Sequence, residues 1–396
     1  MGCGSRMQAS TQTTATMASP RWRRQLSVAA VVAAATTFGL TYSLSAPLIA
    51  MSLVARGHSS LFIGINAAMH ALGVLLAAPL LPGLAARFGA RTLTVCALVL
   101  AGVLLFLFRL WPIVWLWFPL RIALGASAEV LFVMSETWTN VLSDEGSRGR
   151  TMAIYTAALS LGMVLGPALL SQVGVNDRAF AIGAIIAIAA VVFVIPPWVL
   201  APARSEAERT QPMRYMKLAP VAMATTVLNA GVETAGLSFI ALYATGMGWS
   251  EHRAMQLIST LMLGAILLQI PIGWLADKMD KRRLALILAW ISAVTALLWP
   301  FALKETHLAF AMVFVWGGLF VGIYTVMLAM VGSRFQGGDL VGVYAVMGLA
   351  WGAGALVGPT VAGVAMLGSA QFGLPGMIAA ACALFAVFMM RSRSST

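Results

Sequence analysis

Charged residues are scarce in this sequence. Asp, Glu, Lys and Arg make up 10% of its 396 residues, whereas soluble domains carry about 25%. Hydrophobic residues make up 60%, and the mean hydropathy is +0.91. A water-soluble fold is therefore excluded. The alternating ten-residue segments of membrane β-barrels are also missing, so we expect an all-α membrane protein whose helices satisfy their own backbone hydrogen bonds.

Cysteine is equally scarce. The three scattered cysteines, Cys3, Cys96 and Cys382, match neither a disulfide framework nor a metal-ligand motif. The sequence also lacks the Gly-x-x-x-x-Gly-Lys-Ser/Thr loop that binds nucleotide phosphates. We therefore expect no metal, no cofactor, no ATP-driven pumping and no enzymatic activity.

Basic residues outnumber acidic ones by 25 to 13. They lie in short tracts between apolar runs, so they are topology signals and predict no nucleic-acid partner. If the N-terminus is cytoplasmic, nineteen lie on the inner side and one within a span. The outer loops hold only Arg56, Arg109, Arg178, Arg253 and Lys304. This asymmetry predicts a multi-pass protein of the inner or plasma membrane with both termini in the cytoplasm.

Long apolar runs predict twelve membrane-spanning helices. An even number agrees with the basic-residue asymmetry, which an odd number would destroy. Several runs exceed the thickness of the hydrocarbon core, so we expect tilted or kinked helices. The expected spans are 27–54, 61–82, 92–109, 112–140, 150–172, 179–200, 218–245, 253–275, 284–303, 307–332, 340–366 and 371–390.

The longest polar stretch between spans covers residues 201–217 and divides the chain into two halves. It predicts a cytoplasmic linker between two six-helix bundles, at 25–200 and 218–391. We interpret residues 1–24 as a disordered cytoplasmic tail, or as sequence upstream of a later start at Met7 or Met17. Residues 392–396 are interpreted as a second cytoplasmic tail.

Two motifs recur in the two halves at an offset of about 190 residues. The segment 83–91 after the second span is similar to 273–283 after the eighth. Gly166-Pro167 in the fifth span recurs as Gly358-Pro359 in the eleventh. Because two unrelated features agree on one offset, we infer pseudo-symmetric six-helix repeats, an architecture of transporters that bind substrate between the repeats.

The loop motif resembles the major facilitator superfamily, whose loop between the second and third helices reads Gly-x-x-x-Asp-Arg-x-Gly-Arg-Arg/Lys. The first copy matches at Gly83, Arg87, Gly89 and Arg91. Ala86 replaces the Asp, so the latch that the family builds from that acid is not expected in the N-terminal half. The second copy matches at Gly273, Asp277, Lys278, Arg282 and Arg283, with Asp280 in place of the second glycine.

Motifs within the spans extend the resemblance. Arg121-Ile122-Ala123-Leu124-Gly125 is similar to the family's fourth-helix signature. Gly162-x-x-x-Gly166-Pro167 is similar to the fifth-helix motif of antiporters, although Leu170-Ser171 replaces its trailing glycines. Ser135-Glu136-Thr137-Trp138, Arg148-Gly149-Arg150 and Gln269-Ile270-Pro271-Ile272-Gly273 resemble the YcaD-type branch, which has no settled substrate. From about residue 25 onward, the resemblance implies a twelve-helix transporter fold.

Ionisable residues inside spans are functional candidates, because burying them in a membrane is unfavourable by several kcal/mol. Glu233 lies near the centre of the seventh span, one turn after Asn229, so the two share a face. A carboxyl in this position can load and release protons, as proton-coupled transport requires. The alternative is a neutral, hydrogen-bonded Glu that ties helices together.

Arg121 and Glu129 are eight residues apart in the fourth span. That is about 12 Å of helix rise, too far for an easy salt bridge. Arg121 therefore either binds an anionic group, stabilises an ionised acid across the cavity, or is structural. Glu129 either meets water or substrate, or neutralises Arg121 through water.

His70 follows Asn66 by one turn in the second span, and imidazole changes charge near neutral pH. It is either a proton relay or a hydrogen-bond partner of a neighbouring helix. Glu136 and Asp277 lie near cytoplasmic ends, where pairing with Arg or Lys would control opening. The glycine and proline motifs allow a bend or close helix packing: Gly162, Gly166, Pro167, Gly358 and Pro359.

The sequence thus predicts a secondary transporter that moves a small solute by alternating access, with proton-coupled efflux as the favoured mode. Proton-linked uptake of a sugar, peptide or organic anion is an alternative. A transporter-like membrane scaffold or sensor is an alternative of another class. The expected partners are a small-molecule substrate, protons and the lipid bilayer, and the expected oligomeric state is a monomer.

Overall fold

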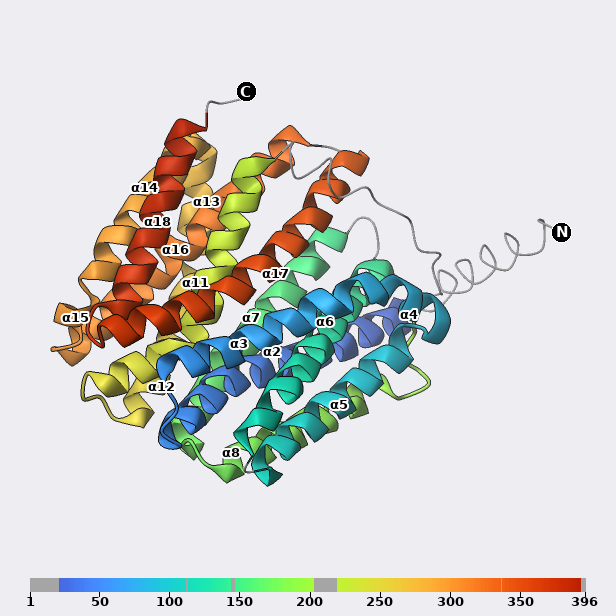
Figure 1. Ribbon diagram of the computed structural model, residues 1–396. Helices are drawn as coiled ribbons and strands as arrows, with labels where there is room; N and C mark the ends of the chain where they lie inside the picture. Colours follow the sequence, from blue (N-terminus) through green and yellow to red (C-terminus); the bar gives the residue numbers. More distant parts are fainter. Residues whose placement is uncertain (1–20, 112, 144–146, 203–218, 336, 393–396) are drawn as a thin grey trace.

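The computed structural model describes residues 21–111, 113–143, 147–202, 219–335 and 337–392, which are almost entirely helical (Figure 1). Most of the predicted tail 1–24 and linker 201–217 lies outside these ranges, as do residues 393–396. The first described helix begins at Arg21, so the end of the predicted tail is helical. No strand occurs in the described ranges.

The two halves of the chain form two bundles. The N-terminal bundle contains α2 (Arg21–Ala55), α3 (Ser60–Ala77), η1 (Ala78–Leu80), α4 (Leu81–Phe88), α5 (Ala90–Leu110), η2 (Val114–Leu116), α6 (Trp117–Leu142), α7 (Arg148–Val173), α8 (Asp177–Ala189) and α9 (Val191–Val194). The C-terminal bundle contains α11 (Pro220–Gly246), α12 (Glu251–Leu267), α13 (Gln269–Lys278), α14 (Lys281–Leu297), α15 (Trp299–Ala302), α16 (Thr306–Arg334), α17 (Gly337–Gly368) and α18 (Gly373–Arg391).

Eleven helical stretches in the described residues are long and apolar enough to cross a membrane. The predicted ninth span, 284–303, is divided between α14 and α15. The division falls at Leu298 because Pro300 has no N–H to donate to the carbonyl of Ala296. Together with these two helices the structure has the twelve crossings predicted.

The predicted sixth span, 179–200, is too long. Helix α9 ends at Val194, because consecutive prolines at Pro196 and Pro197 cannot continue a helix. Other helices of the N-terminal bundle bind the non-helical segment that follows. The Ser27 hydroxyl accepts a bond from the Leu200 N–H at 2.9 Å, and the Trp138 indole donates to the Leu200 carbonyl at 2.6 Å.

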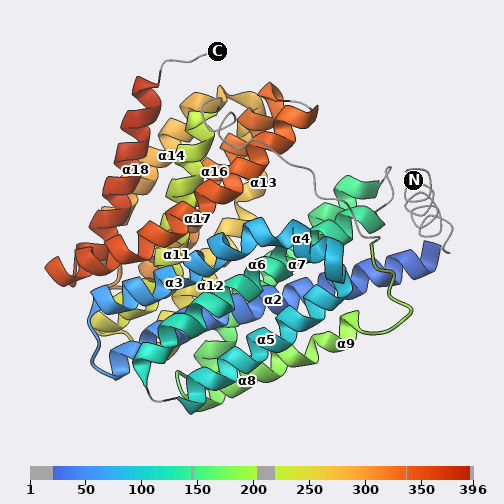
Figure 2. The same ribbon diagram turned by 45° about the vertical axis from the view of Figure 1, so that its right-hand side comes forward.

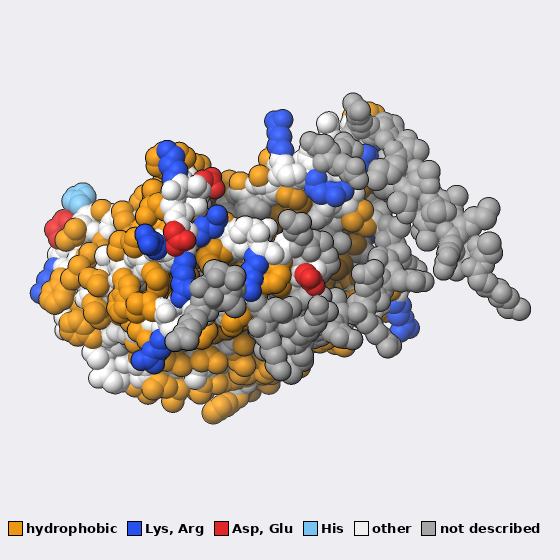
Figure 3. Space-filling model, turned by 90° about the horizontal axis from the view of Figure 1, so that it is seen from above, with side chains coloured by type: hydrophobic (Ala, Val, Ile, Leu, Met, Phe, Trp, Pro, Cys, Tyr) orange, Lys and Arg blue, Asp and Glu red, His pale blue; other side chains and the backbone are white. Residues whose placement is uncertain are grey.

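Large apolar side chains cover the outer faces of the helices. Leu384, Ile185 and Val192 are 64–70% exposed. Figure 3 shows the face seen from above, where apolar side chains are extensive and Lys and Arg are interspersed among them. Contiguous apolar surface of this extent is unfavourable in water and matches lipid tails.

The bundles contact each other through α3 with α17 and through α7 with α12 (Figures 1 and 2). The contacts are closest at the end opposite the termini, which we call the closed end. A Cβ on Gly64 would lie 2.3 Å from the Pro359 carbonyl oxygen, and one on Gly363 would lie 2.4 Å from that of Ser60. Only glycine permits backbones to approach so closely.

Helix α3 stays close to α17 as far as Leu75, which a Cβ on Gly352 would meet at 2.3 Å. Beyond it the bundles separate toward the end that bears the termini, which we call the open end. A Cβ on Gly83 or on Gly348 would meet nothing within 4 Å. On α13, Ile270 and Trp274 are 79% and 57% exposed. The two bundles are therefore joined at one end and apart at the other.

Replacing Gly64 with leucine should prevent the closed end from closing. A leucine side chain would overpack this contact and destabilise the closed conformation by about 1–3 kcal/mol. Since about 1.4 kcal/mol changes the ratio of two states tenfold, the closed conformation should become much less populated. Spin labels at Ala55→Cys and Gln371→Cys, in a background without other cysteines, should move apart in the variant. The control is Gly376→Leu, where a Cβ meets nothing within 4 Å. Unchanged label distances in Gly64→Leu would show that this contact does not hold the end closed.

Candidate functional site

A cluster of buried polar side chains lies between the bundles. Arg121 of α6 is 3% exposed and His70 of α3 is 5% exposed. With Tyr42 of α2 they line a small cavity that Thr234 and Ser238 of α11 close from the other bundle. The rings of Tyr42 and His70 are 5.2 Å apart. The cluster therefore joins side chains from both halves of the duplication.

Several atoms of this cluster, and one of Asn66 a turn before His70, have no hydrogen-bond partner among the described residues. They are Nε and Nη1 of Arg121, Nδ1 of His70 and Nδ2 of Asn66. No ion pair joins Arg121 to Glu129 or to any other carboxylate in the part of the chain that the structure describes. A buried guanidinium without a counter-ion destabilises the fold, so this arrangement is one that a bound group would complete.

Gly125 explains how Arg121 and His70 come together. A Cβ at this position would lie 1.9 Å from the His70 carbonyl oxygen. Likewise, a Cβ on Gly73 would lie 1.9 Å from the carbonyl oxygen of Ile122. The glycine of the fourth-helix motif thus lets α6 pack directly on the backbone of α3.

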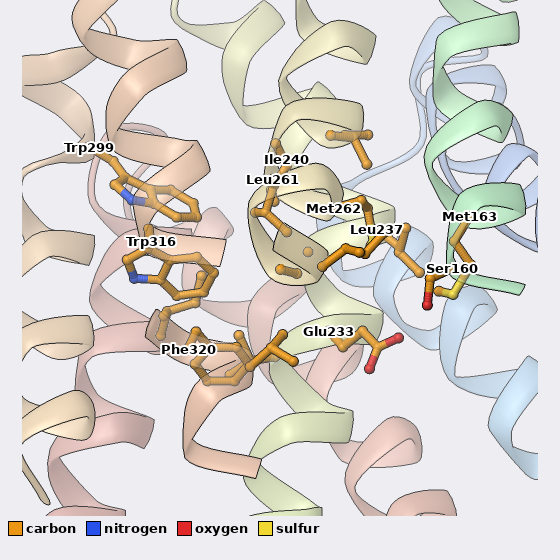
Figure 4. Close-up of a pocket in the computed structure, with 17 residues that line it drawn as sticks. Ser160, Met163, Glu233, Leu237, Ile240, Leu261, Met262, Trp299, Trp316 and Phe320 are labelled. Atoms are coloured by element: carbon orange, nitrogen blue, oxygen red, sulfur yellow. The ribbon is translucent and has the colours of Figure 1, made fainter. Parts of the chain in front are cut away.

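Glu233 lies on α11 beside a second, larger cavity of about 160 Å³. The amide of Asn229 donates to its Oε2 at 3.3 Å, so the two residues share a face as expected. Glu233 is half-buried and interacts electrostatically with Tyr42. Figure 4 shows its carboxylate directed toward Ser160 and Met163 of α7. The carboxyl therefore lies where the two bundles face each other.

The other two carboxyls of the fourth span lie nearer the open end. Glu129 is half-buried, Glu136 is exposed, and the two interact electrostatically. The neighbouring Ser135 shares a hydrogen bond of 3.0 Å with Tyr155 of α7. Neither Glu136 nor Asp277 forms an ion pair among the described residues, so within those residues neither acts as a charged latch in this conformation.

The arginines of the two loop motifs make equivalent contacts. Arg91 donates to the carbonyl of Val199, which follows the sixth span. Arg282 donates to the carbonyls of Met389 and, at 2.6 Å, Ser392, at the end of the twelfth span. A cation is favourable at the carbonyl end of a helix. In each bundle this arginine therefore fastens the last span to the third.

The remaining motif residues make local contacts. Arg87 lies over the ring of Phe88, and Lys278 lies 3.6 Å from the ring centroid of Trp274. Gly89 has a φ of +81°, which permits the sharp turn from α4 to α5. A Cβ on Gly273 would meet nothing within 4 Å.

The glycine and proline motifs serve packing within each bundle. A Cβ on Gly162 would lie 2.1 Å from the Thr36 carbonyl oxygen, and one on Gly166 would lie 2.1 Å from Oγ of Ser43. In the other half, a Cβ on Gly358 would meet the carbonyl oxygen of Gly231 at 2.1 Å. Helices α7 and α17 both continue through their prolines, Pro167 and Pro359.

Sequence reasoning missed several residues that line the two cavities. Tyr42 was not selected, nor were Trp299, Trp316 and Phe320, which line the larger cavity. The four-residue spacing of Trp316 and Phe320 was visible in the sequence, but membrane helices contain many aromatics that face lipid. Gln269 was noted only as part of a motif, and its side chain accepts a bond from Thr325 of α16.

Two six-helix bundles with polar side chains buried between them define a membrane transporter. Comparison with known proteins agrees. The sequence profile of the Major Facilitator Superfamily matches residues 26–257 and 221–396. The chain belongs to this family of transporters, which are not enzymes, and the resemblance inferred from the motifs is confirmed.

Individual relatives include transporters of unknown substrate. The chain is 27% identical over 263 residues to the uncharacterized transporter YfkF of Bacillus subtilis, covering 65% of this chain and 67% of YfkF. It is 22% identical over 291 residues to the uncharacterized transporter YcaD of Salmonella enteritidis, covering 71% of this chain and 74% of YcaD. The YcaD-like branch is thereby supported.

Solved structures share the fold at low identity. The nucleoside transporter NupG superposes with a TM-score of 0.75 at 12% identity, covering 92% of this chain and 98% of NupG. A bacterial homolog of the human lysosomal transporter Spinster, described as inward-facing and unoccupied, superposes with a TM-score of 0.74 at 13% identity. The match covers 94% of this chain and 96% of the homolog. A D-xylose-proton symporter superposes with a TM-score of 0.69 at 16% identity, covering 91% of this chain and 97% of the symporter.

Replacing Arg121 with methionine should stabilise the protein. Apolar replacement of buried charges can raise stability by about 1–4 kcal/mol, and the Arg121 guanidinium lacks a counter-ion among the described residues. We expect a higher Tm in detergent for Arg121→Met. The comparison variant Arg282→Met should lower the Tm, because it removes two bonds to carbonyls. A lower Tm in Arg121→Met would assign this arginine a structural role.

Proposed function

We propose that this transporter exports a small solute in exchange for protons by alternating access. We further propose that it lies in the inner or plasma membrane with both termini in the cytoplasm, so that the open end faces the cell interior. The single observation that carries the proposal is the position of Glu233, whose carboxyl lies at the boundary of the two bundles.

The surroundings of Glu233 support a coupling role. Its carboxylate is directed toward Ser160 and Met163 of α7, which belongs to the other bundle (Figure 4). A carboxyl that is wetted from one side and then the other can take up a proton from one side and release it to the other. Ionisable residues inside membranes mark proton and substrate pathways.

The bundle contacts support alternating access. Within each bundle, glycines hold helices backbone to backbone, so the bundles can move as rigid units. Between the bundles, Gly64 and Gly363 make backbone contacts toward the closed end, whereas in the described residues a Cβ on Gly83 or Gly348, toward the other end, would meet nothing within 4 Å. Rocking of rigid repeats about a central site is how transporters of this architecture alternate.

Replacing Glu233 with glutamine should abolish proton coupling. The amide preserves shape and hydrogen bonding but cannot carry a proton in exchange. In proteoliposomes, solutes would be screened for uptake and efflux with and without a pH gradient. Gradient-driven flux, normalised to folded protein, should fall to background in Glu233→Gln and persist in the control Glu251→Gln, an exposed acid at the closed end. Full gradient-driven flux in Glu233→Gln would contradict the coupling role and leave Glu233 with a structural role.

The orientation can be tested by labelling single cysteines. A cysteine at Lys281, at the open end, should react only with reagent applied from the cytoplasm. A cysteine at Arg178, at the closed end, should react only from outside. Reversed labelling at both positions would invert the orientation, and labelling of both from one side would contradict an even number of crossings.

A further inference from the structure

The larger cavity has an aromatic wall. Trp299, Trp316 and Phe320 lie one above another on one side of it (Figure 4). The rings of Trp299 and Trp316 meet edge to face at 4.9 Å, and those of Trp316 and Phe320 stack at 5.0 Å with 3° between planes. These contacts fix the rings in place, so the wall is preformed. We call this cavity the aromatic chamber.

The rest of the chamber lining is almost wholly apolar. The indole N–H of Trp316 donates to the Ser292 carbonyl at 3.0 Å and is unavailable to a ligand. The chamber measures about 160 Å³, and an apolar cavity of about 150 Å³ takes up benzene. It can therefore hold an aromatic ring or an aliphatic group of that size. The other lining residues are Ser160, Met163, Val232, Gly236, Leu237, Ile240, Ile258, Leu261, Met262, Ala265, Ile266, Val321 and Ile378.

Glu233 is the one charged side chain among the described residues of this lining. It lies across the chamber from the aromatic wall, with its carboxylate toward α7 (Figure 4). A ligand that filled the apolar space would place a polar group beside this carboxylate. A positively charged group is favoured there, because the carboxylate would attract it.

Acidic side chains also lie between the chamber and the open end. Tyr324 of α16 interacts electrostatically with both Glu233 and Glu136, and Glu136 interacts with Glu129. Carboxyls of both bundles are therefore within electrostatic range of Tyr324. A series of like charges attracts counter-ions and raises their local concentration.

Arg121 does not cancel this acidic character at the chamber. It lines the smaller cavity, on the side of Tyr42 and His70, and is absent from the chamber lining. An anionic solute would meet Glu136, Glu129 and Glu233 before it reached Arg121. Charge and shape together thus favour a cation at the chamber and disfavour an anion.

We propose that the aromatic chamber binds the apolar body of a small organic cation, with its ammonium group beside Glu233 and with Glu129 and Glu136 attracting it from the open end. This substrate class rests on the proposed export function and makes Glu233 the group that substrate and proton occupy in alternation.

Equilibrium dialysis of the purified protein in detergent, at mildly alkaline pH, tests the proposal with two single-ring probes of opposite charge. Benzyltrimethylammonium should bind at least tenfold more tightly than benzenesulfonate. Glu233→Gln should weaken binding of the cation at least tenfold. Phe320→Ala should also weaken it, and Glu251→Gln should leave it unchanged. The Tm of each variant would confirm that it is folded.

Preference for benzenesulfonate, binding of neither probe, or unchanged cation affinity in folded Glu233→Gln would overturn the proposal. The assay needs no transport and no pH gradient. Cation binding without gradient-driven flux would refute the proposed function and leave the binding site intact. Gradient-driven flux of other solutes without cation binding would refute the proposed binding site and leave the proposed function intact.

Discussion

The structure depends on one constraint, which is that helices in a membrane must associate without help from the hydrophobic effect. Lipid is as apolar as the helix surface, so close van der Waals contact has to hold the helices together. In this protein the contact is backbone to backbone. Gly125 packs on His70, Gly166 on α2 and Gly358 on Gly231, each with no room for a Cβ.

The same contact has two uses. Inside each bundle it joins helices firmly, and the arginines Arg91 and Arg282 fasten the last span of each bundle to the third. Between the bundles, in the part of the chain that the structure describes, it occurs toward the closed end through Gly64 and Gly363. A contact that forms at one end and is absent at the other is what lets two rigid bodies change their relative tilt.

Rigid bundles also determine where charges can be placed. Basic side chains cap helix ends or lie over aromatic rings there, as Arg87 and Lys278 do. Away from the helix ends, the ionisable groups face the boundary between the bundles rather than lipid. Arg121 and Glu233 line separate cavities and form no ion pair among the described residues. Each is therefore left with capacity to interact with something that enters from the open end.

The sequence by itself determined the number of crossings, the internal duplication, the family and the pairing of Asn229 with Glu233. The crossings follow from composition, the duplication from motifs that recur about 190 residues apart, the family from the resemblance of those motifs, and the pairing from spacing along one helix. All of these can be read without knowing which helices touch. The tertiary structure alone decided that α9 stops at Val194, that Gly125 brings Arg121 to His70, and that Trp299, Trp316 and Phe320 form a wall opposite Glu233. Those contacts join residues from different helices. When all the helices are apolar on every side, the hydrophobic pattern within one helix does not show which of its faces packs against which neighbour.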